Sequence, residues 1–146
     1  MATDKNKIKI LFLCTGNSCR SQMAEGWARH LKSDVIEAYS AGIRLIGLNK
    51  RAIKVMAEAG VDISMHVSKH VDELSGIDFD YVVTLCDNAA ANCPVFGDET
   101  SVIHKPFNDP YLASGTEKEI MTVFRKVRDD IKEFIETMPQ SLKKLA

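Results

Sequence analysis

Apolar residues follow two different spacings along this chain. Short runs rich in strand-forming residues occupy four segments, and each run predicts a buried β-strand. The predicted strands are residues 8–13, 35–41, 79–85 and 102–104. In three other segments apolar residues recur every three or four positions, which is typical of helices with one buried face. The predicted helices are residues 21–31, 49–59 and 116–138.

Local signals set the expected ends of these helices. Ser21 is a candidate N-terminal cap for the first helix, with Glu25 in its first turn. Gly60 follows the second helix, at a position where glycine commonly ends one. Pro139 follows the third helix and is expected to stop it, because proline cannot continue the helical hydrogen-bond ladder.

The alternation of strands and helices predicts an α/β fold. We expect three layers, with a four-stranded parallel sheet flanked by helices. Ligands of such sheets bind beyond the carboxyl ends of the strands. Cys14, Cys86 and the loop that holds Asp109 each follow a predicted strand, so they should converge at one end of the sheet. The length and the lack of any Gly- or Pro-rich divide predict a single domain, residues 1–146.

Charge and hydropathy narrow the possible partners. The net charge of -1 provides no broad basic surface for nucleic acid. The longest apolar runs are far shorter than the roughly 18 residues that span a bilayer, and the start of the chain lacks the features of a signal peptide. We therefore expect a cytoplasmic protein that binds neither nucleic acid nor a membrane. Nothing in the sequence demands more than a monomer.

Four cysteines stand at positions 14, 19, 86 and 93. Permanent disulfides are disfavoured in a reducing compartment, and neither pair has the CxxC spacing of common structural zinc sites. The four histidines, at positions 30, 66, 70 and 104, also lack a tight metal-binding spacing. We expect no metal and no cofactor, so the cysteines are either reactive or simply packed as small apolar residues.

The segment CTGNSCRS is a candidate oxyanion site. Cys14 ends a strand and Arg20 begins a helix, with small polar residues between them. Backbone amides of such a loop, the helix start and an arginine all attract an anion, and the same field favours a nucleophilic thiolate at Cys14. The candidate oxyanion-binding residues are Thr15, Gly16, Asn17, Ser18, Cys19, Arg20 and Ser21. The alternative is an ordinary turn with a buried Cys14 and a surface Arg20, and Cys19 itself fits a small residue that points away from the anion.

Taken together, several segments resemble the thioredoxin-coupled arsenate reductases, which share the fold of the low-molecular-weight protein tyrosine phosphatases. The similarity begins in CTGNSCRSQMAEGW and continues through the rest of the chain in the expected order. The further matching segments are YSAG at 39–42, GVDIS at 60–64, VVTLCDNAAANCPVF at 82–96 and NDP at 108–110. The resemblance implies reduction of arsenate to arsenite in arsenic detoxification, with phosphate or sulfate as competing oxyanions.

Asp109, Cys86 and Cys93 are the remaining candidate catalytic residues. A protonated Asp109 can supply the proton for the departing oxygen, and Pro110 fixes its backbone, although an ordinary Asp-Pro turn is the alternative on local sequence. Cys86 can attack the sulfur of an arsenylated Cys14, and Cys93 can then attack Cys86, leaving a disulfide for an outside reductant. Two unrelated buried cysteines are the alternative. The resemblance implies both roles, and thioredoxin as the reductant.

Some members of the similar family hold potassium beside the loop, through residues that match Asn17, Glu25 and Ser40 and a further acid. Lys69 stands where that acid is expected, so we predict no bound potassium. Asn17 and Ser40 are still expected to hold the loop in shape through hydrogen bonds.

Three functions fit these residues. Arsenate reduction uses all three thiols, whereas a low-molecular-weight protein tyrosine phosphatase would need only Cys14, Arg20 and Asp109, and Tyr111 after the Asp-Pro pair resembles the phosphatases. A reductase of this kind is expected to keep weak phosphatase activity. A non-enzymatic redox sensor that signals through a disulfide between Cys86 and Cys93 is the third possibility.

Overall fold

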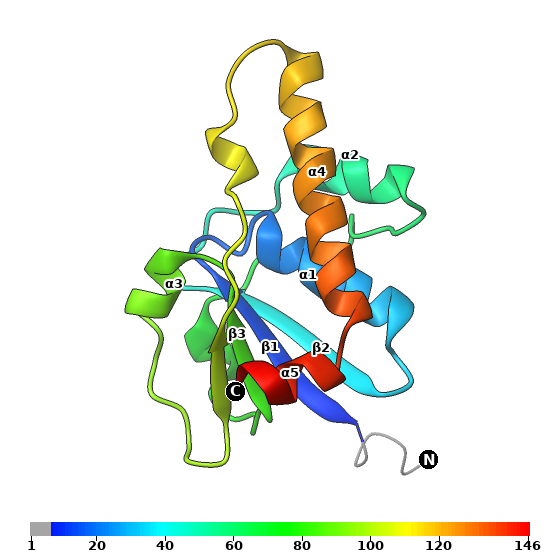
Figure 1. The fold of residues 1–146 in the computed structure, drawn as a ribbon. Helices are drawn as coiled ribbons and strands as arrows, with labels where there is room; N and C mark the ends of the chain where they lie inside the picture. The colour runs from blue at the N-terminus through cyan, green and yellow to red at the C-terminus, as the bar shows by residue number, and fades with distance from the viewer. Residues whose placement is uncertain (1–6) are drawn as a thin grey trace.

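The computed structural model describes residues 7–146, which form one four-stranded sheet with its covering helices (Figure 1). All strand pairs are parallel, and the strand order is β2-β1-β3-β4. The predicted α/β fold is therefore confirmed. The strands are β1 (Ile8–Cys14), β2 (Ile36–Gly42), β3 (Tyr81–Thr84) and β4 (Ser101–His104). The α-helices are α1 (Arg20–Leu31), α2 (Lys50–Glu58), α3 (Asp87–Ala91), α4 (Glu117–Glu136) and α5 (Gln140–Leu145).

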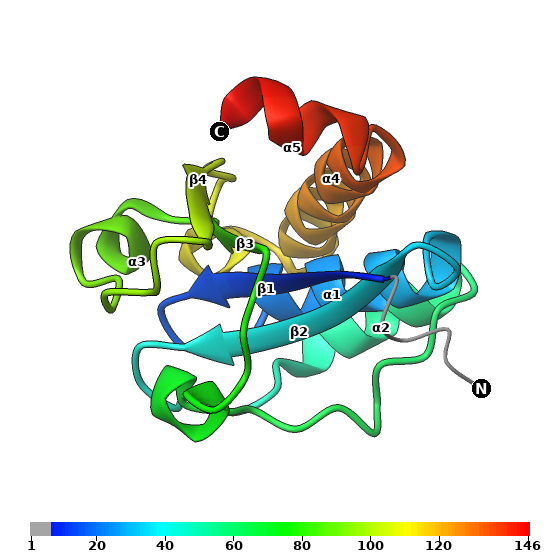
Figure 2. The ribbon, with the colours of Figure 1, turned by 90° about the horizontal axis from the view of Figure 1, so that it is seen from below.

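Strand β1 lies at the centre of the sheet, and its sequence explains its position. Its residues 10–13 are completely buried, which requires cover on both faces of the sheet. A strand covered on both faces reads as a continuous apolar run, as this one does. Because all four strands run in the same direction, β1 and β3 deliver Cys14 and Cys86 to one end of the sheet. In Figure 2 the arrowheads of β1 and β2 point towards the side that carries α3.

Helix α4, with 20 residues, packs along α1 and α2. Thr116 caps its start in a reciprocal capping box with Glu119. A stripe of buried residues then runs along it and packs against α1 and α2. The buried side chains are Met121, Phe124, Val127, Ile131, Phe134 and Ile135. Trp27 of α1 also donates from its indole nitrogen to the carbonyl oxygen of Arg128, at 3.1 Å, so the two helices are joined by a directional bond.

One of the expected helix ends is wrong. Helix α1 begins at Arg20 and its N-cap is Cys19, so Ser21 is not the cap and Glu25 lies beyond the first turn. The hydroxyl of Ser21 instead faces the loop before the helix, where it contacts Cys14. The long helix does end before Pro139, because α4 stops at Glu136, but a further helix, α5, begins directly after Pro139. Proline suits the start of a helix, because the first backbone amides there have no helical partner.

Four short elements are absent from the sequence prediction. They are the helices α3 and α5, the 3-10 helix η2 (Val71–Leu74) and the 3-10 helix η3 (Pro110–Leu112). Each is shorter than two helical turns and has too few apolar positions to show a periodic pattern. The segment between Cys86 and Cys93 thus contains a helix in this structure. In the part of the chain that the structure describes, no helix is long and apolar enough to cross a membrane.

Replacement of Ile131 by alanine tests the packing of α4. Ile131 is completely buried, and such truncations cost about 2–5 kcal/mol of unfolding free energy. We expect Ile131→Ala to lower the midpoint of urea unfolding accordingly. The matched control is Thr122→Ala on the exposed side of the same helix, which should change the unfolding free energy by about 0.5 kcal/mol or less. Equal effects of the two substitutions would contradict the packing described.

Candidate active site

The loop between β1 and α1 surrounds the thiol of Cys14. This side chain is 3% exposed, and its Sγ lies 2.9 Å from the Oγ of Ser21. Strand β1 ends at Cys14, and the first turn of α1 brings Ser21 back towards it. A hydroxyl in this position can donate to a thiolate, which stabilises the charged form of the sulfur.

Asn17 holds the loop in its shape. Its φ angle of 49° lies in the left-handed region, which asparagine tolerates better than most residues. The side chain is completely buried and fully used: its Nδ2 donates to Ser21 Oγ at 2.9 Å and to Ser40 Oγ at 3.0 Å. Its Oδ1 accepts from the backbone amide of Lys69 at 2.7 Å and from Gln22 Nε2 at 2.9 Å. Asn17 thus joins the loop to α1, to β2 and to the segment before η2.

Ser40 continues this network to a buried carboxylate. Its hydroxyl donates to Glu25, whose other carboxylate oxygen lies 2.7 Å from Arg29. The ammonium group of Lys69 donates to the carbonyl oxygen of Val67 at 3.0 Å. Lys69 therefore contacts the loop through its backbone, and replacement of a potassium ion by its ammonium group stays a prediction.

Arg20 is held from the opposite side by the segment that follows β4. Its Nη1 donates to the carbonyl oxygen of Phe107 at 3.1 Å, and its Nη2 lies 3.4 Å from Asp109 Oδ2. Asp109 is itself fixed, because its Oδ1 accepts from the backbone amide of Tyr111 at 3.0 Å. The structure thus brings together Arg20 and Asp109, which are 89 residues apart in the sequence.

A cavity of about 240 Å³ lies over the loop and is large enough for a tetrahedral oxyanion. Its lining residues are Cys14, Thr15, Gly16, Ser18, Cys19, Arg20, Arg44, Ile46, Asp109, Tyr111 and Leu112. Two of the predicted oxyanion-binding residues, Asn17 and Ser21, are absent from this lining and are completely buried behind it. Arg44 is a cation that the sequence did not single out, since it lies in no recognisable motif.

Cys86 approaches the same loop from the end of β3. It is the N-cap of α3, and its Sγ lies 3.2 Å from the hydroxyl oxygen of Thr15. Asn88 donates to that hydroxyl oxygen at 3.1 Å. Cys86 also lines a second hollow, of about 350 Å³, together with Arg20 and Asp109. The structure therefore brings these residues together at one end of the sheet, as the sequence predicted.

Cys93 lies two residues beyond the end of α3 and is half-buried. Burial raises the pKa of its thiol above the ordinary value. All four cysteines are free thiols in this structure. The two thiols that flank α3 are thus both reduced here.

The thiol of Cys19 differs from the others in its electrostatics. Burial raises its pKa to about 12, and the negative charges of Cys14 and Asp109 add to this effect, although a hydrogen bond to Ser18 opposes it. A thiol with this pKa is uncharged at neutral pH and is a poor nucleophile. Cys19 therefore forms an apolar part of the cavity wall.

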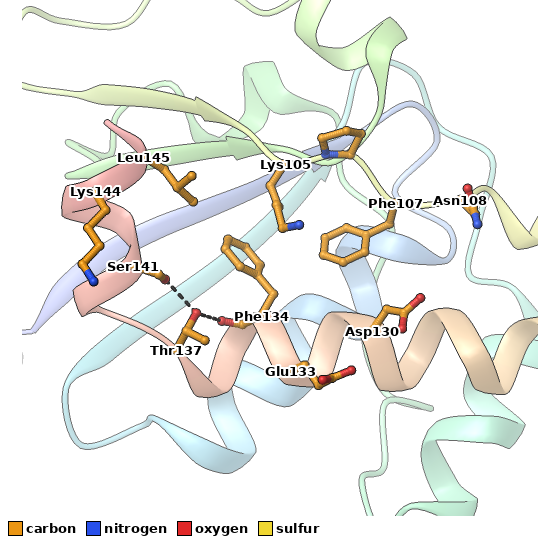
Figure 3. Close-up of a pocket in the computed structure, with 11 residues that line it drawn as sticks. Lys105, Phe107, Asn108, Asp130, Glu133, Phe134, Thr137, Ser141, Lys144 and Leu145 are labelled. Carbon is orange, nitrogen blue, oxygen red and sulfur yellow. Dashed lines mark hydrogen bonds between the residues drawn. The ribbon is translucent and has the colours of Figure 1, made fainter.

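A larger hollow lies elsewhere, between the segment after β4 and the helices α4 and α5 (Figure 3). Its volume is about 640 Å³. The close-up shows Lys105 beside the rings of Phe107 and Phe134, and its Nζ lies 5.2 and 5.8 Å from the two ring centres. None of the cysteines lines this hollow. Size alone is therefore a poor guide to the reactive site of this protein.

Gly42 and Ser68 are structural residues of the site that sequence reasoning missed. A Cβ atom at Gly42 would lie 2.7 Å from the backbone nitrogen of Asn17, so only glycine lets β2 approach the loop this closely. Ser68 donates to the carbonyl oxygen of Asn17 at 2.7 Å. The glycine at the end of a strand was a visible signal, whereas nothing in the sequence distinguishes Ser68 from other serines.

A buried cysteine at a strand end, a loop of small residues and an arginine in the first helical turn together define a phosphatase-type oxyanion site. The chain belongs to the low molecular weight phosphotyrosine protein phosphatase family, whose model matches residues 9–146. The predicted fold family and the prediction of an enzyme are thereby confirmed.

The chain is also similar to proteins that bear the name arsenate reductase. The chain is 50% identical over 137 residues to an arsenate reductase of Bacillus subtilis strain 168, and the match covers 91% of this chain and 98% of the relative. It is also similar to a solved arsenate reductase in the reduced state, with a TM-score of 0.72, 33% identity and coverage of 92% and 98% of the two chains. An arsenate reductase in the phosphate binding state gives a TM-score of 0.67, 31% identity and coverage of 95% and 99%.

The close approach of β2 to the loop predicts the effect of Gly42→Ala. The added methyl group would overlap the backbone of Asn17 and Arg44, so the loop must shift. A small shift of the groups in a preorganised site commonly weakens its action by a factor of about ten or more. We therefore expect the dissociation constant of inorganic phosphate, measured by calorimetry, to rise by that factor. The matched control is Gly76→Ala, because a Cβ there meets nothing within 4 Å. Unchanged phosphate binding in Gly42→Ala would contradict the tight approach.

The raised pKa of Cys19 predicts resistance to alkylation. With a pKa of about 12, only about one Cys19 in 10,000 is a thiolate at pH 8. Mass-spectrometric mapping after iodoacetamide treatment should find Cys19 unmodified in the native protein and modified in guanidinium chloride. Rapid labelling of Cys19 in the native state would contradict the burial described.

Proposed function

We propose that this protein reduces arsenate to arsenite with Cys14, Cys86 and Cys93 acting in sequence, and that thioredoxin restores the reduced enzyme. The observation that carries the proposal is the position of Cys86, whose Sγ lies 3.2 Å from Thr15 in the loop that also holds Cys14. Relatives with nearly full-length matches and the name arsenate reductase support it. A phosphatase has no use for a second thiol at this place.

In the first step arsenate binds over the loop and Cys14 attacks. Arg20 can grip two oxygens of the anion, and backbone amides of the loop can donate to the others. Before binding, the guanidinium lies 3.4 Å from the carboxylate of Asp109. An incoming oxyanion takes over this arginine and leaves the carboxyl group of Asp109 free to face the departing oxygen. Asp109 then gives its proton to the departing oxygen as the sulfur–arsenic bond forms.

In the second step Cys86 attacks the sulfur atom of Cys14. A sulfur–sulfur bond forms, the sulfur–arsenic bond breaks, and its electron pair leaves with arsenic. Arsenic(V) thereby becomes arsenic(III) and departs as arsenite, while two thiols are oxidised to one disulfide. Thr15 suits this step, because its hydroxyl contacts Cys86 and its backbone belongs to the oxyanion loop.

In the third step Cys93 attacks Cys86 and releases Cys14. The resulting disulfide between Cys86 and Cys93 needs Cα atoms about 4.4–6.8 Å apart. The five residues of α3 lie between the two cysteines and extend over about 7.5 Å of helix, so at least part of α3 has to unwind. The cost is small, because Ala89 is the one buried residue of this five-residue helix. Thioredoxin then reduces the new disulfide with two electrons.

The second candidate function is hydrolysis of a phosphate ester, most plausibly phosphotyrosine. The family model supports it, and Cys14, Arg20 and Asp109 are sufficient for the chemistry. Tyr111 is 58% exposed and lines the cavity, where its ring could contact an aryl group. Water would then have to resolve the phosphorylated Cys14, so Cys86 and Cys93 would be dispensable. We propose this reaction as a weak side activity of the reductase.

The proposal includes the cellular setting of the enzyme. We place it in the cytoplasm as a monomer, where a thioredoxin system is available and where phosphate and sulfate compete with arsenate for the loop. The chain of 146 residues acts as a single catalytic domain without metal or cofactor.

A coupled assay with thioredoxin, thioredoxin reductase and NADPH tests the relay. We expect arsenate-dependent NADPH consumption in the unmodified protein and a fall of at least about a thousandfold in Cys14→Ser, Cys86→Ser and Cys93→Ser, because each thiol is used once per turnover. Hydrolysis of an aryl phosphate is the internal control. It should be lost in Cys14→Ser and kept in the other two variants. Aryl phosphate hydrolysis without any arsenate reduction would identify the protein as a phosphatase instead.

A further inference from the structure

His104 links the edge of the sheet to the helix that Cys86 begins. It is the last residue of β4, and its Nε2 lies 2.9 Å from Asp87 Oδ1 in the first turn of α3. Its Nδ1 lies 2.8 Å from the hydroxyl oxygen of Thr84, its partner in the neighbouring strand β3. One imidazole ring therefore bridges β3 and α3. The proposed relay gives this ring no role.

The sheet side of this bridge is rigid. Thr84 is completely buried, and its hydroxyl also lies 3.3 Å from the carbonyl oxygen of Ile103. Lys105, the residue after His104, donates from its backbone amide to the carbonyl oxygen of Thr84 at 2.9 Å. The ring of His104 is thus held by a buried hydroxyl within a paired stretch of sheet.

The helix side of the bridge has little other support. Helix α3 has five residues and one buried side chain, Ala89, and a helix this short is not stable by itself. Two hydrogen bonds between side chains of the described residues tie it to the rest of the molecule, one from Asn88 to Thr15 and one between Asp87 and His104. Because Cys86 is the N-cap of α3, any movement of Asp87 also moves Cys86.

The hydrogen-bond chemistry of His104 is consistent with a permanent role in this bridge. A neutral ring can donate from Nε2 to Asp87 while its Nδ1 accepts from the hydroxyl of Thr84. A protonated ring donates from both nitrogens, and Thr84 then donates to Ile103. The contact with Asp87 is satisfied in both forms. The bridge therefore needs a donor at Nε2 rather than a particular charge.

We propose that His104 and Asp87 are positioning residues for the second thiol: their contact fixes the first turn of α3 and so holds Cys86 at the loop of Cys14. The inference rests on the proposed function, in which Cys86 attacks the sulfur of Cys14, the sulfur–arsenic bond breaks and arsenic leaves as arsenite with the electron pair. That attack requires the incoming sulfur in line with the breaking bond, so a small displacement of Cys86 slows this step. Attack of Cys14 on the oxyanion does not involve His104.

The test is single-turnover release of arsenite from His104→Ala and Asp87→Ala, measured beside hydrolysis of an aryl phosphate. We expect arsenite release to slow about tenfold in each variant, because a misplaced nucleophile loses much of its rate advantage. The double variant should be no slower than either single variant, since both remove the same contact. Aryl phosphate hydrolysis and the thermal unfolding midpoint should stay unchanged.

Two further variants separate positioning from a general structural effect. His104→Gln keeps an N–H donor for Asp87 and should restore most of the rate. The matched control is His70→Ala, because His70 also pairs with an exposed aspartate at the start of a short helix, at 3.4 Å from Asp72, but lies beside no thiol. Unchanged arsenite release in His104→Ala would overturn the proposal. So would an equal loss of arsenite release and aryl phosphate hydrolysis.

A second measurement decides the proposal even if the unmodified protein releases no arsenite, in which case the proposed function fails. Cys86 is 7% exposed, so its alkylation depends on access. Loss of the bridge should raise the rate of Cys86 alkylation by iodoacetamide at least about threefold relative to Cys14, with no change in His70→Ala. Equal alkylation of Cys86 in His104→Ala and the unmodified protein would overturn the positioning role.

Discussion

The site depends first on the buried side chain of Asn17. This amide makes hydrogen bonds to Ser21, Ser40, Gln22 and the backbone of Lys69, and so joins three separate segments behind one loop. A buried polar group left without partners costs about 1–3 kcal/mol, so these bonds fix the loop in one shape. Asn17 also has a left-handed backbone conformation, which bends the loop beneath the cavity. The cradle for an oxyanion is therefore built from behind, by residues that do not line it.

The three thiols of the proposed relay lie on elements that differ in how firmly they are anchored. Cys14 and Arg20 belong to β1 and α1, which are buried in the centre of the fold. Cys86 and Cys93 flank α3, a short helix with one buried residue. This arrangement suits the proposed thiol relay. An oxyanion needs preorganised donors, whereas thiols that exchange disulfides must change partners. Helix α3 is tied to the sheet by the contact between Asp87 and His104, and to the loop by the hydrogen bond from Asn88 to Thr15.

The parts of the fold that sequence predicts well are those governed by burial. The four strands and three long helices are recognisable because their apolar residues follow the period of the element they form. The errors fall where local rules compete with tertiary contacts. Ser21 has the chemistry of a helix cap, but its hydroxyl is used by Cys14 and Asn17 instead. Pro139 follows the end of α4 as predicted, but only the structure shows that α5, with its buried Leu142, begins directly after it.

The sequence by itself determined the parallel sheet, the strand-to-helix loop of Cys14 and Arg20, and the convergence of Cys86 and Asp109 on it, because parallel strands deliver their carboxyl ends to one edge. Only the tertiary structure decided which side chains support that edge. Gly42 is needed because β2 passes within contact distance of the loop backbone. Ser68 and His104 matter through partners 51 and 17 residues away in the chain. Such contacts leave no periodic or local signal, since they exist only once the strands are paired.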